Sequence, residues 1–236
     1  MSEVKNYEAV KELASKHLGK VGGDGYKDTY EPNLLVKIPR YLNREGYGLT
    51  GNEFKGVDTW NAYEVSAITT KGQPVAGMLK IVCPSDSEFH VESKSIKLYL
   101  NSFNMTQIGD NAADCISGIE ARVKRDLDEL LETTTTVSFY ASEFETENLS
   151  FSEEYKDVAE ITNLDEIDFT AFKSDASQLE SGEGNVLKIR SNLLRSNCRV
   201  TNQPDWGDVF IYIKGEDIPS AESLAKYIVS HRTVSH

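Results

Sequence analysis

The chain has 236 residues, of which 39% are hydrophobic and 27% are charged, and its formal net charge is −13. This composition is typical of a soluble globular protein, and the length allows one large domain or two modest ones. The negative charge disfavours non-specific binding to nucleic acid or to an anionic membrane. No stretch approaches the roughly 18 apolar residues that span a bilayer. We therefore expect neither a membrane nor a direct nucleic-acid partner.

The three cysteines are Cys83, Cys115 and Cys198. An odd number at wide spacing disfavours a disulfide framework and indicates the reduced thiols of a cytoplasmic protein. The first twenty residues carry charges and no apolar segment of the kind found in a signal peptide, which favours the same compartment. Four scattered histidines and no Cys-x-x-Cys pair predict that no metal is bound.

The first 58 residues look irregular, apart from a helical pattern over residues 10–18. From residue 59 the pattern sharpens. Residues 59–70 and 74–82 are rich in Val, Ile, Tyr and Trp, and a Lys-Gly-Gln turn lies between them. This order predicts a β-hairpin.

Two helices and a strand are predicted after the hairpin. Residues 91–103 form a short amphipathic pattern, and residues 111–132 place apolar side chains on one face at spacings of three and four. Asp110 or Asn111 can cap the second helix. Residues 133–141 are β-branched and alternate, which predicts a strand. This stretch therefore reads as one module of order strand, strand, helix, helix, strand.

A similar order begins again after an acidic stretch. Strands are predicted at 186–194 and 209–214, a connection at 198–207, and a helix capped by Ser220. An internal repeat with its second copy cut short describes this order most simply. The expected organisation is an N-terminal extension at 1–58, a first module at 59–142, an acidic linker with some packed parts at 143–184, and a truncated second module at 185–236.

The segment 196–207 combines a thiol, a carboxylate and a Pro-Asp-Trp-Gly turn. Cys198 could act as a nucleophile, since a neighbouring cation such as Arg199 lowers the pKa of a thiol. Asp205 could donate a proton if burial raises its pKa. The alternative is a small buried thiol beside a turn, and on spacing alone that is the commoner case.

A second candidate site is the segment 92–99. Glu92, at a helix start, can accept hydrogen bonds from the N–H edge of a base. Ser93 and Lys94 could meet a phosphate, because backbone N–H groups and positive charge coincide in a first helical turn. The alternative is an ordinary capped helix with a solvated lysine face. The sequence has no Gly-x-Gly-x-x-Gly after a strand, so no Rossmann site is predicted.

Together these segments resemble the NADPH-dependent 7-cyano-7-deazaguanine (preQ0) reductases of queuosine biosynthesis. That family carries Glu-Ser-Lys-Ser-hydrophobic-Lys-Leu-Tyr, here residues 92–99, and Ser-Asn-Cys-x-x-Thr-x-Gln-Pro-Asp-Trp-Gly, here residues 196–207. The resemblance extends over residues 26–232 and fits the longer, two-module branch. It implies an α+β tunnelling fold of two tandem modules, with antiparallel sheets and paired helices on one face. It also implies a homo-oligomer.

The resemblance further implies a nitrile reduction. The Cys198 thiolate attacks the nitrile carbon of preQ0 to form a covalent thioimide, and Asp205 supplies protons. Two NADPH molecules deliver hydrides to give the aminomethyl product, preQ1. The remaining implied contacts are Val91, Glu92 and Ser93 to the substrate, and Ser93 and Lys94 to NADPH.

The sequence departs from the family at its C-terminal end. In the two-module branch a His-Glu pair that contacts the substrate and an Arg-Gly pair that contacts NADPH follow the segment matching residues 229–232. Here we expect the second module to be incomplete. Three explanations are open: the chain is a fragment, a partner chain completes the fold, or the protein has lost its activity. The missing strands motivate one alternative to reduction, a non-catalytic deazapurine-binding or assembly subunit. A second alternative keeps Cys198 and Asp205 but transfers ammonia onto the thioimide, as the resemblance to other tunnelling-fold proteins allows.

Overall fold

The computed structural model describes residue 12 and residues 27–49, 53–141, 152–197 and 204–234. The chain divides into two compact units, Met1–Thr146 and Glu147–His236. The helix expected at 10–18 lies outside the described residues, apart from Glu12. In the described part of the chain, no helix is long and apolar enough to cross a membrane.

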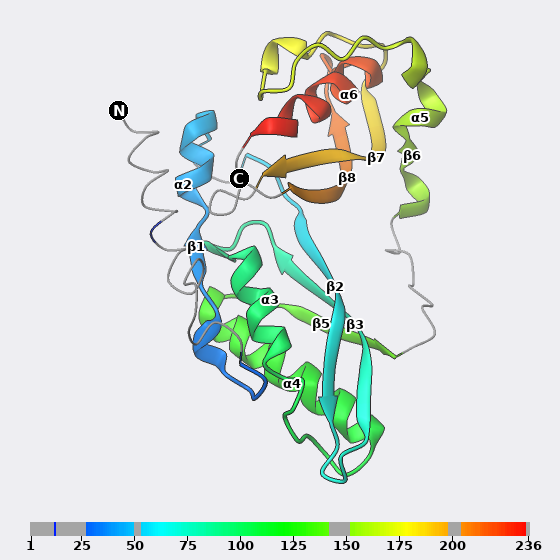
Figure 1. Ribbon diagram of the computed structural model, residues 1–236. Coiled ribbons are helices and arrows are strands. Elements are labelled where there is room, and N and C mark those ends of the chain that lie inside the picture. The colour runs from blue at the N-terminus through cyan, green and yellow to red at the C-terminus, as the bar shows by residue number, and fades with distance from the viewer. Residues whose placement is uncertain (1–11, 13–26, 50–52, 142–151, 198–203, 235–236) are drawn as a thin grey trace. The chain divides into compact units, whose positions relative to one another are not determined.

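The first unit contains a three-stranded antiparallel sheet of order β2-β3-β5 (Figure 1). Its strands are β2 (Val57–Ile68), β3 (Pro74–Pro84) and β5 (Thr136–Ala141). The predicted hairpin is confirmed, and β2 begins two residues earlier than expected because Val57 and Asp58 continue the pairing with β3. Alternate β3 residues, among them Leu79 and Ile81, are fully buried on the face that the helices cover.

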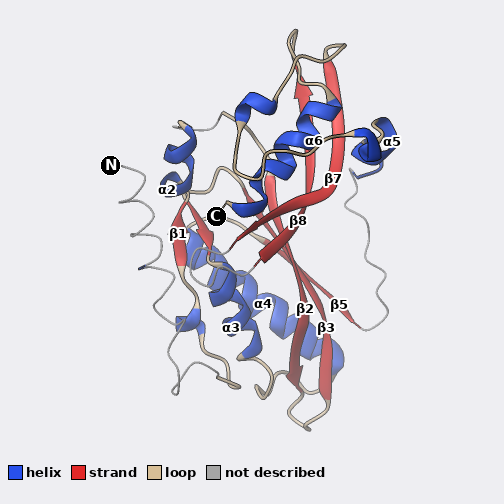
Figure 2. Ribbon diagram, turned by 45° about the horizontal axis from the view of Figure 1, so that its top comes forward, coloured by secondary structure: helices blue, strands red, loops and turns tan. Residues whose placement is uncertain are grey.

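Helices α3 (Ser93–Asn101) and α4 (Ala112–Leu131) pack against that sheet in one core (Figure 2). Asn111 caps α4 as predicted, since its side chain accepts a hydrogen bond from the N–H of Asp114. The face of α4 that packs on the sheet is fully buried at every fourth residue, at Cys115, Ile119, Val123, Leu127 and Leu131. Each such aliphatic side chain stabilises the unit by about 1.5–3 kcal/mol.

A segment expected to be irregular belongs to this core. Residues 28–39, which we call the first strap, contain the 3-10 helix η1 (Pro32–Leu34) and strand β1 (Lys37–Pro39). Strand β1 pairs antiparallel with β4 (Phe89–Val91), and Leu34 and Leu35 are buried in the main cluster. Helix α2 (Tyr41–Arg44) and the 3-10 helix η2 (Glu45–Tyr47) follow.

The second unit contains an antiparallel pair, β7 (Val186–Asn197) and β8 (Pro204–Lys214), and helix α6 (Ala221–Ser230). A short strand β6 (Lys156–Asp157) lies parallel to β7. Ile189 of β7 and Leu224 and Ile228 of α6 share a core with Val158. The other elements are α5 (Val158–Ile161) and the 3-10 helices η3 (Ser152–Glu154), η4 (Leu164–Glu166), η5 (Ala176–Gln178) and η6 (His231–Thr233).

The structure confirms one expectation for the second unit and corrects another. Ser220 caps α6 as predicted, accepting a hydrogen bond from the N–H of Ser223 at 3.1 Å. The prediction of a connection at 198–207 is wrong for residues 204–207, because these residues belong to β8. Pairing of β7 and β8 continues as far as Asn197 and Pro204, because polar side chains are tolerated on the open face of a hairpin.

The hairpins β2–β3 and β7–β8 have the same design. Both first strands have 12 residues and both second strands have 11. The register shifts between the sixth and ninth residues of each first strand, which are Ala62 and Val65 in β2 and Ser191 and Leu194 in β7. Two residues there face one on the partner strand, which makes a β-bulge. Each second strand begins with proline and has glycine in fourth place.

The segments that hold the helices are also duplicated. A second strap, residues 172–182, contains η5 as the first contains η1. The N–H of Glu92 donates to the Val36 carbonyl at 2.8 Å, and the N–H of Ser220 donates to the Glu180 carbonyl at 2.9 Å. At the helix ends, two strap N–H groups donate to serine hydroxyls, from Glu31 to Ser102 and from Asp175 to Ser230.

The α+β class with antiparallel sheets is therefore confirmed, and within it the two units share a strap, a hairpin and a capped helix. Helix α4 and strand β5 have no counterpart among the described residues of the second unit.

Candidate active site

The start of α3 brings several predicted site residues together. Glu92 is the N-cap of this helix and is only 7% exposed. Its carboxylate accepts hydrogen bonds from the N–H of Lys94 at 3.0 Å and of Ser95 at 2.6 Å. The Ser93 hydroxyl also donates to Oε1, at 3.4 Å. A carboxylate has about four lone-pair sites, so Oε2 keeps acceptor capacity for a ligand. Glu92 is thus both a helix cap and a candidate binding group.

The first strap fixes the backbone of Glu92. The N–H of Val36 donates to the Ser95 hydroxyl at 3.1 Å, and that hydroxyl donates to the Glu92 carbonyl at 2.8 Å. With the bond from Glu92 N–H to the Val36 carbonyl, these contacts form a closed ring. The carboxylate therefore has a defined position before any ligand arrives, which lowers the entropy lost on binding.

Ser93, Lys94 and Val91 lie beside this carboxylate. The backbone N–H groups of Lys94 and Ser95 donate to Glu92, so the groups left for the predicted phosphate contact are the half-buried side chains of Ser93 and Lys94. A hydroxyl and an ammonium group suit a phosphate ester. Val91 is 1% exposed and packs in the core, so it can offer a ligand only its backbone.

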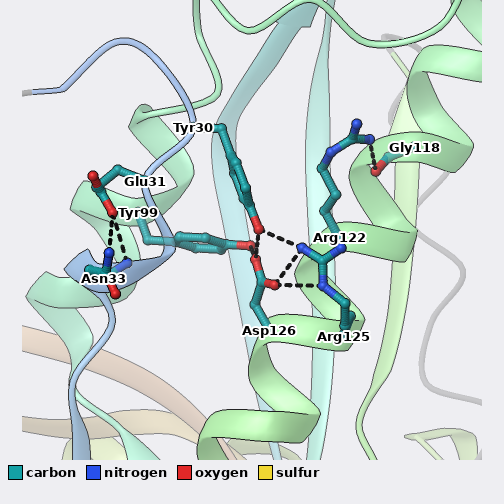
Figure 3. A network of polar contacts seen from close by, with 8 residues as sticks. All are labelled: Tyr30, Glu31, Asn33, Tyr99, Gly118, Arg122, Arg125 and Asp126. Atoms are coloured by element: carbon teal, nitrogen blue, oxygen red, sulfur yellow. Dashed lines mark hydrogen bonds and ion pairs between the residues drawn. The ribbon is translucent and has the colours of Figure 1, made fainter.

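A second polar network, which the sequence interpretation missed, anchors the first strap (Figure 3). The hydroxyls of Tyr30 and Tyr99 both donate to Oδ2 of Asp126 at 2.6 Å. Arg125 donates to Oδ1 of the same carboxylate, from Nε at 3.0 Å and from Nη2 at 2.8 Å. The Asp126 carboxylate, on α4, thus connects this helix to the first strap and to α3.

This network changes the acidity of both tyrosines. Burial, and next the hydrogen bond to Asp126, raises the pKa of Tyr30 to about 12. The same causes raise the pKa of Tyr99. Both hydroxyls therefore remain donors at any physiological pH. Tyr99 closes the 92–99 segment, but nothing in the sequence pairs it with a carboxylate 27 residues away.

In the second unit, Asp205 is the second residue of β8 and pairs in register with Ser196. Its side chain is half-buried, and Oδ2 has no surface open to solvent. Cys198 lies outside the described residues. It follows Asn197, whose N–H donates to the Val234 carbonyl at 2.8 Å. Asp205 thus lies beside the strand end that precedes Cys198 in the sequence.

The other two cysteines are structural. Cys83 and Cys115 are buried free thiols. Burial raises the pKa of Cys83 to about 11, with the Asp58 carboxylate as the second cause. Burial also raises the pKa of Cys115. Both therefore stay protonated and poor as nucleophiles near neutral pH.

Each unit carries a different part of the predicted chemistry. The hairpin position of Asp205 is occupied by Val75 in the first unit, and the helix-cap position of Glu92 is occupied by Ser220 in the second. Among the described residues, no group of His, Cys, Asp or Glu side chains could hold a metal ion. A pocket of about 400 Å³ near Ile161 and Glu222 contains none of the predicted site residues.

Comparison with known proteins decides the family. Residues 26–139 match a family model described as nitrile reductase, 7-cyano-7-deazaguanine-reductase N-term. The chain is 37% identical over 211 residues to the NADPH-dependent 7-cyano-7-deazaguanine reductase of Coxiella burnetii (strain Dugway 5J108-111), covering 88% of this chain and 72% of the relative. It is 38% identical over 226 residues to the enzyme of the same name from Rickettsia akari (strain Hartford), covering 93% and 77%. The chain belongs to the 7-cyano-7-deazaguanine reductase family.

Both candidate segments fall inside these matches. The reductase family model contains residues 91–94. The match to the Rickettsia akari reductase covers 93% of the chain, and residues 198–205 lie too far from either end to fall in the unmatched share. The chain spans about three quarters of the length of these reductases.

Proposed function

We propose that this chain reduces the nitrile of preQ0 to the aminomethyl group of preQ1 with NADPH. The observation that carries the proposal is the identity of 37–38% to reductases of that name, over matches that include both motif segments. The geometry adds a buried, prepositioned carboxylate at Glu92 that can accept hydrogen bonds from the N–H edge of a deazapurine.

In the proposed first step, the sulfur of Cys198 bonds to the nitrile carbon, and one π bond of the nitrile breaks. The nitrogen takes a proton from Asp205, so the product is a neutral thioimide. Cys198 is the cysteine suited to this role, because Cys83 and Cys115 are buried and their pKa values are raised.

The remaining steps need two hydrides and further protons. NADPH supplies the hydrides when bound, one molecule for each two-electron step. The Cys198 sulfur leaves as a thiolate after the first transfer, which gives an imine. Asp205 then serves as a proton relay to the nitrogen. We assign the substrate contacts to Val91, Glu92 and Ser93, and the NADPH contacts to the Ser93 and Lys94 side chains.

We also propose that the two units are tandem modules of the tunnelling fold. Support comes from the duplicated hairpins, which share strand lengths and bulge position. The duplicated straps and helix caps add independent support. A homo-oligomer remains a prediction, made because proteins of this fold usually close their sheets into a barrel by association of subunits.

Oxidation of NADPH tests the activity. Adding preQ0 to purified protein and NADPH should remove the nicotinamide absorbance, with two NADPH consumed for each preQ1 formed. Calorimetric binding of preQ0 without NADPH oxidation would instead identify a deazapurine-binding subunit. A product that forms only with ammonia, and without NADPH, would identify amidine synthesis. Either outcome would contradict the reductase proposal.

A further inference from the structure

One surface of the second unit combines an indole with two guanidinium groups. Trp206 is 65% exposed, although it is the largest side chain of β8. The guanidinium carbon of Arg195 lies 5.8 Å from the indole centroid, and that of Arg232 lies 5.3 Å from it. Both distances are within the range of cation–π attraction. We call these three residues the indole cluster.

The backbone holds the indole cluster in place. Arg195 and Trp206 are direct partners across β7 and β8, so their side chains lie on the same face of the pair. Arg195 Nη1 donates to the Arg232 carbonyl, which links β7 to η6. The N–H of Thr233 in turn donates to the Phe172 carbonyl of the second strap at 3.1 Å.

The two guanidinium groups form a local positive charge in an acidic chain. Among the described residues, no carboxylate forms an ion pair with Arg195 or Arg232, whereas Arg190 on the same strand pairs with Asp157. An arginine pair without a carboxylate, in a chain of net charge −13, suits an anionic ligand.

The first unit shows that the fold does not require this cluster. At the positions of Arg195 and Trp206 its hairpin has Ser66 and Ala76, which are also direct partners. Ser102 and Ser230 accept matching strap bonds, so Asn104, two residues after Ser102, corresponds to Arg232. The Ser66 hydroxyl donates to Asn104 Oδ1 at 2.6 Å. The first unit therefore forms the same hairpin and helix end with three smaller side chains. Folding does not explain the indole and the two guanidinium groups, so binding is the better explanation.

We propose that the indole cluster binds a phosphorylated adenosine, with the base stacked on Trp206 and a phosphate held by Arg195 and Arg232. An exposed indole offers a stacking surface for a base, and a guanidinium offers paired donors for a phosphate. The identification of this nucleotide as the adenosine end of NADPH rests on the proposed function.

The fluorescence of Trp206 can report ligand binding at the cluster, because the chain has only two tryptophans. The parent for the test is Trp60→Phe, which removes the half-buried indole of the first unit. NADP⁺ and 2′-phosphoadenosine 5′-phosphate should change the Trp206 fluorescence saturably, and inorganic phosphate should do so only at much higher concentration. No saturable change with either nucleotide would overturn the proposal, and so would equal affinity for inorganic phosphate.

Variants that copy the side chains of the first unit separate binding from folding. In Arg232→Asn and Arg195→Ser, the Kd for 2′-phosphoadenosine 5′-phosphate should rise about tenfold or more, since each loses a charge-assisted bond. Trp206→Ala should weaken calorimetric binding by a similar factor. Lys214→Gln removes one positive charge from the far end of β8 and should leave the Kd unchanged. Equal Kd values for Arg232→Asn and for its parent would contradict the proposal.

Failure here can be told apart from failure of the proposed function. A chain that oxidises NADPH with preQ0 but shows no Trp206 response contradicts the indole cluster alone. A chain that binds the adenosine phosphate and does not turn over preQ0 contradicts the reductase proposal alone.

Discussion

Glu92 caps α3 with the same carboxylate that we propose binds the substrate, and substitution can separate the two roles. Serine caps the matching helix in the second unit, at Ser220. Glu92→Ser should therefore keep the cap and remove the binding group, so that the KM for preQ0 rises about tenfold or more through loss of a charged hydrogen bond. The melting temperature should stay near that of the parent. Steady-state kinetics and thermal unfolding measure both.

Glu92→Ala serves as the matched control. It removes the cap as well, and alanine at an N-cap costs about 1 kcal/mol of stability. The KM effect should match that of Glu92→Ser, and the melting temperature should fall. A Glu92→Ser enzyme with an unchanged KM would show that the carboxylate is only a cap.

Tyr30 gives a pH prediction. Its folded-state pKa is about 12, above the ordinary value of 10, so the protonated hydroxyl is the form that stabilises the fold. This contribution is complete below pH 10 and is lost as the pH rises through 12. The free energy of unfolding of the parent should therefore fall toward that of Tyr30→Phe between pH 10 and 12. Urea titrations across this range measure the difference, and a constant gap would contradict the assignment.

At the residue scale, part of the site is visible in the sequence and part is not. Glu92 and Asp205 stand out because they lie in short, polar segments between apolar ones. Asp126 does not, since on α4 it looks like any charged residue of an exposed face. Only the fold brings Tyr30 to it, across 96 positions.

At the scale of elements, Asp126 supports the first strap. Its side chain is 8% exposed and accepts from two tyrosine hydroxyls, so Asp126→Asn should lower the free energy of unfolding by about 1–3 kcal/mol. Glu129→Gln, at an exposed position of the same helix, should change it by less than about 0.5 kcal/mol. Equal effects of the two substitutions in urea unfolding would argue against the strap anchor.

The two equivalent hairpin glycines should respond differently to alanine. A Cβ at Gly77 would lie 2.3 Å from the Tyr140 carbonyl oxygen of β5, and backbone cannot move away easily. Gly77→Ala should therefore destabilise the first unit by about 1–3 kcal/mol. A Cβ at Gly207 meets only Leu194, at 3.8 Å, so Gly207→Ala should be tolerated.

Thermal unfolding of the two glycine variants checks this contrast. Similar melting temperatures would show that β5 does not approach β3 as described.

Which elements are predictable follows from the strength of their periodicity. The hairpins and α4 have long runs with a clear period of two or of three and four, and the sequence predicts them. The first strap escapes prediction, because a three-residue 3-10 helix and a three-residue strand are too short to show a period. The predicted start of β8 is too late, since Pro204, Asp205 and Gly207 are residues typical of turns.

At the scale of the whole molecule, the arrangement of strap, hairpin and capped helix occurs in both units with different side chains. The first unit has an acid at the helix cap and Val75 in the hairpin, whereas the second has Ser220 at the cap and Asp205 in the hairpin. In the sequence, the similarity of the two units is visible as a recurring order of predicted elements. Its extension to the straps needs the hydrogen bonds, because strap residues 28–39 and 172–182 share little beyond an acidic cap.

The proposed chemistry depends most directly on a bond between Cys198 and the substrate. Mass spectrometry of intact protein incubated with preQ0, without NADPH, measures it. We predict an added mass equal to one preQ0 per chain, absent in Cys198→Ala and present in Cys83→Ala. An unmodified mass for correctly folded protein, or an adduct that persists in Cys198→Ala, would contradict the proposed mechanism.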